Sequence, residues 1–287
     1  MIIMMMTLFK ARYSKIVFLS IITLFCFVDA NSQNFAKEFL SKQNDSISQD
    51  VIYLYITPTL TYRNESLEKM PNFSDLEQDV QKDLLDKYAP LYYKAKDSIL
   101  LSLFSENLNK TLAALGFKVI KVDAVDKLPI NIDETHHTLN VAQMEIEEFS
   151  FNDSLVYEGN DREVFYKLIN GVSFNTWFIY NEADSNSRLV FYNEEKLEDF
   201  FSGEIRLIDD ELIATYDYDK IKEEDAYSVA KQNAISSSQY FFNFLMNKYV
   251  WINSSGIDIY YYGIDVESKK IYSDTEPFDN FDLIDYK

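Results

Sequence analysis

The sequence predicts an α+β protein (a mixed α/β fold) in which a largely antiparallel sheet is packed by two main helices. Extended runs rich in β-branched and aromatic residues recur along the chain, which indicates strands. Two long segments, at about 98–115 and 222–249, place apolar or small residues at helical spacing. Turn-forming pairs separate the short β-like runs in the middle of the chain, as in antiparallel meanders.

A strand–helix–strand unit is expected first. Val51–Thr57 (VIYLYIT) ends before Pro58 and is typical of a strand. Leu76–Tyr88 is a candidate helix, and a clearer helix over 98–115 leads into a strand at Phe117–Val122. Gly116 stands where a helix commonly ends in the left-handed conformation. The apolar stripe of the clearer helix is expected to be Leu101, Phe104, Leu108, Leu112 and Leu115.

A long extended segment, Thr138–Phe151, is expected next. Its apolar phase slips between Val141 and Met144, which predicts a bulge or a change of buried face. The acids of this segment are expected to mark its solvent side: Glu145, Glu147 and Glu148.

Several short strands are then expected between Ser154 and Thr215, with turns at Asn170-Gly171 and Asp209-Asp210. The helix over 222–249 begins with three acids that suit its positive end. Its small residues repeat every four positions and should lie close to the sheet: Ala226, Ala230, Ala234 and Ser238. Ile257–Val266 is expected to be a closing strand.

The first residues predict export. Three basic residues precede the apolar run Ile16–Val28, and Ala30 and Ser32 supply small residues for a cleavage site. Cleavage after Ser32 is preferred, with cleavage after Ala30 as the competitor. We therefore expect a signal peptide at 1–32, a polar tether or marginal helix at 33–50, and a single mixed α/β domain at 51–287, with a sub-boundary near 152–162 left open.

The only cysteine, Cys26, lies inside the apolar run. Removal of the leader would leave a chain without disulfides, zinc-thiolate sites or a cysteine nucleophile. A lipid anchor at Cys26 is the alternative, but Phe25 stands where lipoproteins carry a small residue. The expected location is the periplasm or the outer membrane surface, with no transmembrane helix in the mature chain.

The net charge of the chain is −20. Without residues 1–32, 24 basic and 46 acidic side chains remain, a net of −22. Such an acidic chain lacks the basic face that nucleic acids require, so nucleic acid is excluded as a partner. The charge either keeps a solvated protein soluble or forms a docking face for a basic partner or divalent cations.

Most catalytic signatures are absent from the sequence. Its six glycines form neither a phosphate-binding loop nor a dinucleotide fingerprint, and no serine has the glycines of a nucleophile elbow. The two histidines, His136 and His137, are adjacent, so on a strand they face opposite ways and do not suit one metal ion. With Asp133 and Glu134 they could form a loop site, but a polar loop is the simpler interpretation. No catalytic residue, metal or cofactor is predicted.

Carboxylates and aromatic rings leave one chemistry open. Asp217 and Asp219, like Glu145 and Glu147, are two apart and would share a strand face, as the paired acids of glycoside hydrolysis could. The chain is also rich in aromatics, with 21 Tyr and 22 Phe. Those that could form a platform for sugar rings are Trp177, Trp251, Tyr260 and Tyr262, although core packing explains them equally.

Several stretches resemble an uncharacterised family of exported envelope proteins of Bacteroidota, often lipoproteins. They are Tyr53–Pro58 with Arg63–Glu65, Leu115–Val119, Val141–Glu148 and Phe244–Tyr249. The resemblance spans about residues 51–250 and implies no known activity and no functional residues.

Export, acidity and the missing catalytic signatures together favour a non-enzymatic accessory protein of the cell envelope, with an assembly, transport or binding role. The alternative is a glycan-binding or glycan-processing protein that uses paired carboxylates and aromatics.

Overall fold

The computed structural model describes residues 32–284 except 71, 90, 92–93, 130–132, 159–161, 182–187, 210, 255–260 and 275–280. The expected leader, including Cys26, lies outside these residues apart from Ser32. The described chain divides into two compact units. The larger contains Val51–Thr111, Val119–Ser237 and the residues from Asn280 onward. The smaller contains the segment up to Asp50, Leu112–Lys118 and Ser238–Asp279.

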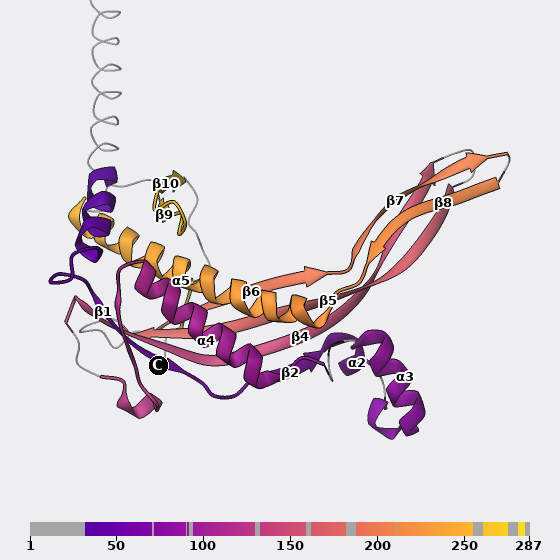
Figure 1. Ribbon diagram of the computed structural model, residues 1–287, viewed down its shortest axis with the longest axis horizontal. Coiled ribbons are helices and arrows are strands. Elements are labelled where there is room, and N and C mark those ends of the chain that lie inside the picture. Colours follow the sequence, from indigo (N-terminus) through magenta and orange to yellow (C-terminus); the bar gives the residue numbers. More distant parts are fainter. Residues whose placement is uncertain are drawn as a thin grey trace, which may run out of the picture. The chain divides into compact units, whose positions relative to one another are not determined.

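The larger unit is built on a seven-stranded sheet with the strand order β11-β6-β5-β4-β1-β3, and β2 also pairs with β4 (Figure 1). Strand β4 runs antiparallel to β5, β5 to β6, and β6 to β11, whereas β1 and β2 pair parallel with β4. The strands are β1 (Val51–Ile56), β2 (Thr61–Asn64), β3 (Lys118–Lys121), β4 (His136–Glu158), β5 (Arg162–Asn181), β6 (Arg188–Glu198) and β11 (Phe281–Ile284).

The predicted α+β class is confirmed, as is the strand–helix–strand unit. Helix α4 (Asp97–Ala114) follows β1 and precedes β3. Its buried stripe is Leu100, Phe104, Leu108 and Leu112, so the predicted stripe is correct except that Leu100 replaces Leu101 at its start. The shorter elements between β1 and β4 are α2 (Glu65–Glu68), η1 (Phe73–Asp75), α3 (Gln78–Tyr88) and η2 (Val125–Lys127).

The predicted bulge is confirmed, because the pairing of β4 with β5 shifts between Val141 and Gln143. The predicted turn at Asn170-Gly171 is wrong, because β5 continues through both residues. Gly171 instead lies opposite Phe149, whose ring occupies the space that a β-carbon on Gly171 would take. A glycine inside a strand can mark such a close approach as well as a turn.

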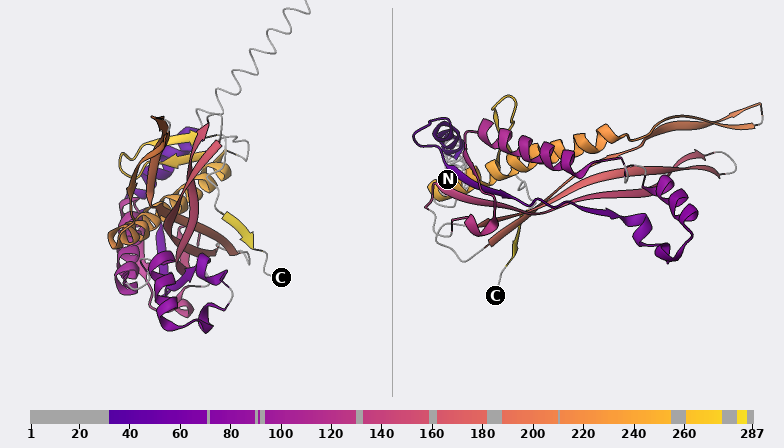
Figure 2. Two further views of the ribbon diagram at one scale, coloured as in Figure 1. Left: turned by 90° about the vertical axis from the view of Figure 1, so that its right-hand side faces the viewer. Right: turned by 60° about the horizontal axis from the view of Figure 1, so that its bottom comes forward.

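Strands β7 (Phe200–Ile208) and β8 (Glu211–Asp219) form a separate hairpin, with the predicted turn at Asp209, where φ is +48°. It packs on the end of the β4–β5 hairpin, where the Phe165 and Tyr216 rings stack 5.3 Å apart. Figures 1 and 2 show both hairpins continuing together beyond β2 and β6. We call β4 and β5 residues 149–169, together with β7 and β8, the distal hairpins.

Helix α5 (Glu223–Asn253) confirms the predicted long helix, and its small residues are buried as expected. In the larger unit it packs on β5 and β6 through hydrogen bonds. The Asn233 amide donates to the Phe174 and Asn193 carbonyl oxygens at 2.7 and 3.1 Å and accepts from Thr176 Oγ1 at 2.9 Å. Asn193 donates back to the Asn233 carbonyl oxygen at 3.0 Å. The contact around Asn233 is therefore polar, and its side-chain amides are hydrogen-bonded.

The smaller unit packs aromatic rings between its segments. Residues 32–43 are helical, so the first part of 33–50, for which the sequence left a tether and a helix open, is a helix. Phe242 of α5 contacts Phe39 at 5.3 Å and Phe117 at 5.7 Å between ring centroids. Gly116 has the predicted positive φ, +101°, and a side chain there would collide with the Gln43 backbone.

Side-chain amides of α5 bind strand β9 (Tyr261–Ile264), which pairs with β10 (Ile271–Asp274). Asn247 exchanges two 2.7 Å hydrogen bonds with the Tyr262 backbone, and Asn243 accepts from the Ile264 N–H at 3.0 Å. The amides thus take the place of a neighbouring strand for β9. None of the helices within the described residues combines the length and apolar composition that crossing a bilayer requires.

Candidate functional site

The centre of β4 presents carboxyl groups to both faces of the sheet. Side chains alternate along a strand, and the register places Glu145 opposite Asn175, and Glu147 opposite Ser173. Ile146 and Glu148 point to the other face, where Phe174 and Thr176 meet α4 and α5. Strand β4 therefore separates two environments, one on the face covered by the helices and one on the opposite face of the sheet.

The expectation that all three glutamates mark a solvent side is wrong. Glu148 is 1 % exposed and Glu145 is 4 % exposed. Glu148 shares its face with the buried residues Met144 and Ile146, so the period of two that buries those side chains also buries the carboxyl group. The alternation of buried and exposed positions along the strand could have predicted that Glu148 is buried. Three acids in close succession instead suggest a face exposed to solvent.

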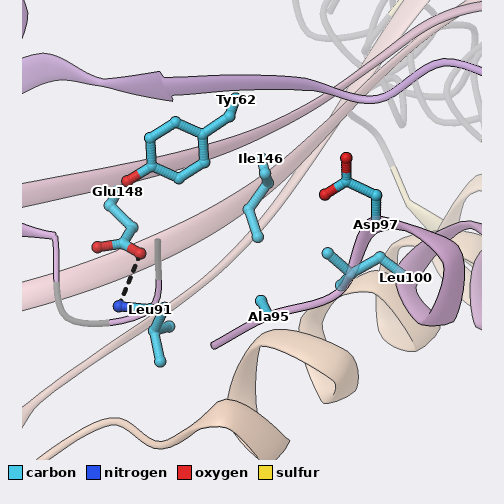
Figure 3. A pocket seen from close by; sticks show the side chains of 7 residues that line it. All are labelled: Tyr62, Leu91, Ala95, Asp97, Leu100, Ile146 and Glu148. Atoms are coloured by element: carbon cyan, nitrogen blue, oxygen red, sulfur yellow. Dashed lines mark hydrogen bonds between the residues drawn. The ribbon is translucent and has the colours of Figure 1, made fainter. Parts of the chain in front are cut away.

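A cavity of about 330 Å³ lies beside Glu148 on the helix side of the sheet. Figure 3 shows its lining side chains: Tyr62 of β2, Leu91 and Ala95 from the α3–α4 connection, Asp97 and Leu100 of α4, and Ile146 and Glu148 of β4. Volumes of this size lie at the lower end of those that hold small ligands, about 300–1,000 Å³.

The Glu148 carboxyl group is held at one oxygen. Its Oε1 accepts a 2.9 Å hydrogen bond from the Leu91 N–H (Figure 3), whereas the buried Oε2 has no hydrogen bond of normal geometry within the described residues. Burial raises the pKa of Glu148 to about 8, although the Leu91 N–H, the Tyr62 hydroxyl and the Lys94 charge oppose the shift. At neutral pH the group is therefore mostly a neutral acid.

The opposite face of the sheet carries a different cluster. The rings of Trp177 and Tyr192, neighbours on β5 and β6, lie 4.9 Å apart, and both side chains are half-buried. The Tyr192 hydroxyl donates to Asn175 Oδ1 at 2.9 Å. Burial, followed by the nearby glutamates, raises the pKa of Tyr192 to about 12. Glu145 joins this face beside Asn175, with the Arg63 guanidinium 3.7 Å from its carboxylate.

The distal hairpins form a third candidate region because they expose apolar side chains. They carry half of the large apolar and aromatic residues that are exposed in the described chain: Phe151, Val156, Tyr166, Phe200, Leu207, Ile208, Leu212, Ile213 and Tyr216. The sequence ranges 149–169 and 200–219, which contain these strands, hold ten acidic and three basic residues. Apolar groups in an acidic setting suit contact with a surface that is apolar and basic.

The remaining candidates from the sequence are dispersed. His136 bonds Asp133 at 2.6 Å, which holds the pKa of that carboxyl group well below its usual range, whereas His137 faces Tyr180. Asp217 and Asp219 share one face of β8 and are exposed. Among the described residues no three metal-ligating side chains gather.

The predicted aromatic platform is only partly assembled. Trp177 shares its face with Glu145 and Glu147, and Tyr192, which the sequence did not single out, completes the ring pair. Trp251 is exposed on α5 in the smaller unit, and Tyr262 is buried there. Tyr260 lies outside the described residues.

A second cavity, of about 270 Å³, lies beside Asp199. Asp199 is buried and accepts from the Tyr218 hydroxyl at 2.7 Å and from the backbone N–H groups of Ile221 and Asn170 at 2.8 and 3.0 Å. Both of its oxygens have partners within the chain, so its role is to join β5, β8 and the segment before α5. Among the described residues that line the two cavities, only Glu148 has a buried carboxyl oxygen without a hydrogen bond of normal geometry.

No protein-family model and no curated protein matches the sequence. Among solved structures, the chain is similar to a homologue of a neuraminyllactose-binding hemagglutinin from Helicobacter pylori. The two share 12 % sequence identity with a TM-score of 0.33, over 72 % of this chain and 90 % of that chain. So low a TM-score assigns neither a fold nor a ligand to this chain.

Proposed function

We propose that this chain is an exported, non-enzymatic accessory protein of the cell envelope that acts by docking onto a partner protein. The observation that carries the proposal is the concentration of exposed apolar side chains on the distal hairpins. Exposed apolar patches commonly mark interaction sites. The acidic surroundings favour a partner with a basic rim, and attraction between opposite charges would speed the encounter.

The periplasm or the outer membrane surface is the proposed location, on the strength of the basic and apolar start of the chain. The distal hairpins suit a docking role because their backbone hydrogen bonds are made within each hairpin. They can therefore present side chains to a partner without giving up their own pairing.

Crosslinked capture from envelope extracts tests this proposal. Leu207 and Leu212 face each other across the β7–β8 hairpin, and 53 % and 40 % of their surfaces are exposed. Replacing both with serine should reduce recovery of a specific partner at least tenfold, while the circular dichroism spectrum stays unchanged. Val125→Ser is the matched control, because Val125 is 52 % exposed and lies outside the distal hairpins. Equal capture by all three proteins, or no partner at any salt concentration, would refute the proposal.

A glycan-binding role is the second candidate, and the Trp177–Tyr192 pair is the observation that favours it. Sugar rings stack on aromatic faces, and the neighbouring Glu145 and Glu147 supply acceptors for sugar hydroxyl groups. Calorimetric titration with a panel of envelope oligosaccharides would test this role. Trp177→Ala should abolish a binding signal that Trp251→Ala leaves intact. The idea fails if the panel gives no signal or if both variants bind equally.

A further inference from the structure

We propose that the cavity beside Glu148 binds a small organic cation, with a primary ammonium group on a short apolar body. This site is independent of the docking role proposed for the distal hairpins, and the two share no residue.

The shape and lining of the cavity define the ligand. Its volume is about 330 Å³, and the side chains of Leu91, Leu100 and Ile146 provide apolar walls. Of the two acids in the lining, Glu148 is buried, whereas Asp97, in the first turn of α4, is exposed. Figure 3 shows the two carboxyl groups on opposite sides of the Ile146 side chain. The cavity therefore suits a compact apolar body that carries a polar group at one end.

The charges of the lining determine the sign of the ligand. Glu148 and Asp97 are acids, Tyr62 contributes a hydroxyl group, and the described residues of the lining include no lysine, arginine or histidine. Lys94 is exposed nearby, where its charge favours ionisation of Glu148 without lining the cavity. An anion would meet two carboxyl groups and no cation among the lining residues that the structure describes, so anionic ligands are disfavoured. The negative charge of the whole chain acts in the same direction.

The Glu148 carboxyl group distinguishes a cation from a neutral ligand. Oε2 is buried and has no hydrogen bond of normal geometry within the described residues, although the Tyr62 hydroxyl is close enough to favour the charged form of the carboxyl group. The Glu148 residue is 99 % buried. An ammonium group that binds the Glu148 carboxyl group would form a charge-assisted hydrogen bond, roughly twice as strong as a neutral one. The carboxyl group must lose its proton to form it, so binding releases one proton to solvent. A neutral hydrogen-bond acceptor would need the protonated acid and would show the opposite pH dependence.

Titration with benzylamine, benzyl alcohol and benzoate tests the proposal, because the three probes share one apolar body and differ in charge. Benzylamine should bind, and the other two should bind at least tenfold more weakly. Because the pKa of Glu148 is about 8, binding should tighten about 20-fold between pH 6.5 and 8.5. The other titratable groups around Glu148 are Tyr62 and Asp97 in the lining and Lys94 nearby. Calorimetry in buffers of different ionisation enthalpy should record close to one proton released at pH 6.5.

Two variants separate the roles of the acids. Glu148→Gln keeps the shape of the side chain and should abolish both the proton release and the pH dependence, with at least tenfold weaker binding. Asp97→Asn should weaken binding a few-fold, whereas Asp79→Asn, which removes a first-turn acid from α3 outside the cavity, should not. Equal binding of benzyl alcohol, tightening at low pH, an unaffected Glu148→Gln variant, or no binding of benzylamine at millimolar concentration would each overturn the proposal.

Discussion

Glu148 is a carboxyl group that the fold keeps mostly neutral at pH 7. Its pKa is raised to about 8 by burial, whereas in the unfolded chain it is near 4.5. Between these two values the folded protein holds a proton that the unfolded chain has released. Stability therefore falls as pH rises from about 4.5 to about 8, and the loss from this group is at most about 5 kcal/mol.

Glu148→Gln should remove that loss, because a glutamine does not ionise and its side-chain oxygen can still accept from the Leu91 N–H. We expect the variant to gain stability relative to the parent as pH rises from 5 to 8, by up to a few kcal/mol. Urea unfolding of both proteins at several pH values measures the difference between their free energies of unfolding. The other acids titrate in both proteins, so their contribution cancels in this difference. A difference that does not change with pH would show that Glu148 ionises normally.

Asn233 joins α5 to two strands, and all its polar atoms are used in a fully buried setting. Asn233→Ala would leave the Thr176 hydroxyl and two carbonyl groups with lost partners, so we expect a loss of about 2–4 kcal/mol in the free energy of unfolding. Gln232→Ala is the control, because Gln232 is the preceding residue on the exposed side of the helix. It should change stability by no more than about 0.5 kcal/mol.

In strand β5, a contact with a neighbouring strand overrides the turn that the local sequence predicts. Asn170-Gly171 is a strong turn pair, yet the Phe149 ring fills the space beside Gly171 from the neighbouring strand. That partner is distant in sequence, so no local rule could have supplied it. The bulge near Val141 and the long helix α5 were predictable, because periodicity within one segment determines both.

Gly171→Val should therefore destabilise the β4–β5 hairpin, by about 1–3 kcal/mol, since the new side chain competes with the Phe149 ring. Phe149→Ala should make room for it. The double variant is expected to lose less stability than the sum of the two single variants, which thermal unfolding of all four proteins measures as a coupling free energy. Simple additivity would mean that the ring moves away at no cost.

At the scale of the whole molecule, composition determined what could be excluded but did not locate the site. The acidity of the chain and its scarcity of glycine are visible in the sequence, and so is the pairing of Glu145 with Glu147 on one face. The Glu148 cavity was not predictable, because it forms where β2, β4, α4 and the connection before α4 come together. Only the tertiary contacts bring Tyr62 and Leu91 to the Glu148 carboxyl group.

Export is the expectation on which the proposed location depends, and the start of the mature chain tests it. The basic residues before Ile16–Val28 and the small residues up to Ser32 predict a mature protein that begins at Gln33. Intact mass measurement on protein from the cell envelope fraction should give that start, with Ala30→Leu combined with Ser32→Leu blocking cleavage. A lipidated protein starting at Cys26 would move the location to a membrane anchor. Unprocessed protein in the cytosolic fraction would remove the basis for an envelope partner altogether.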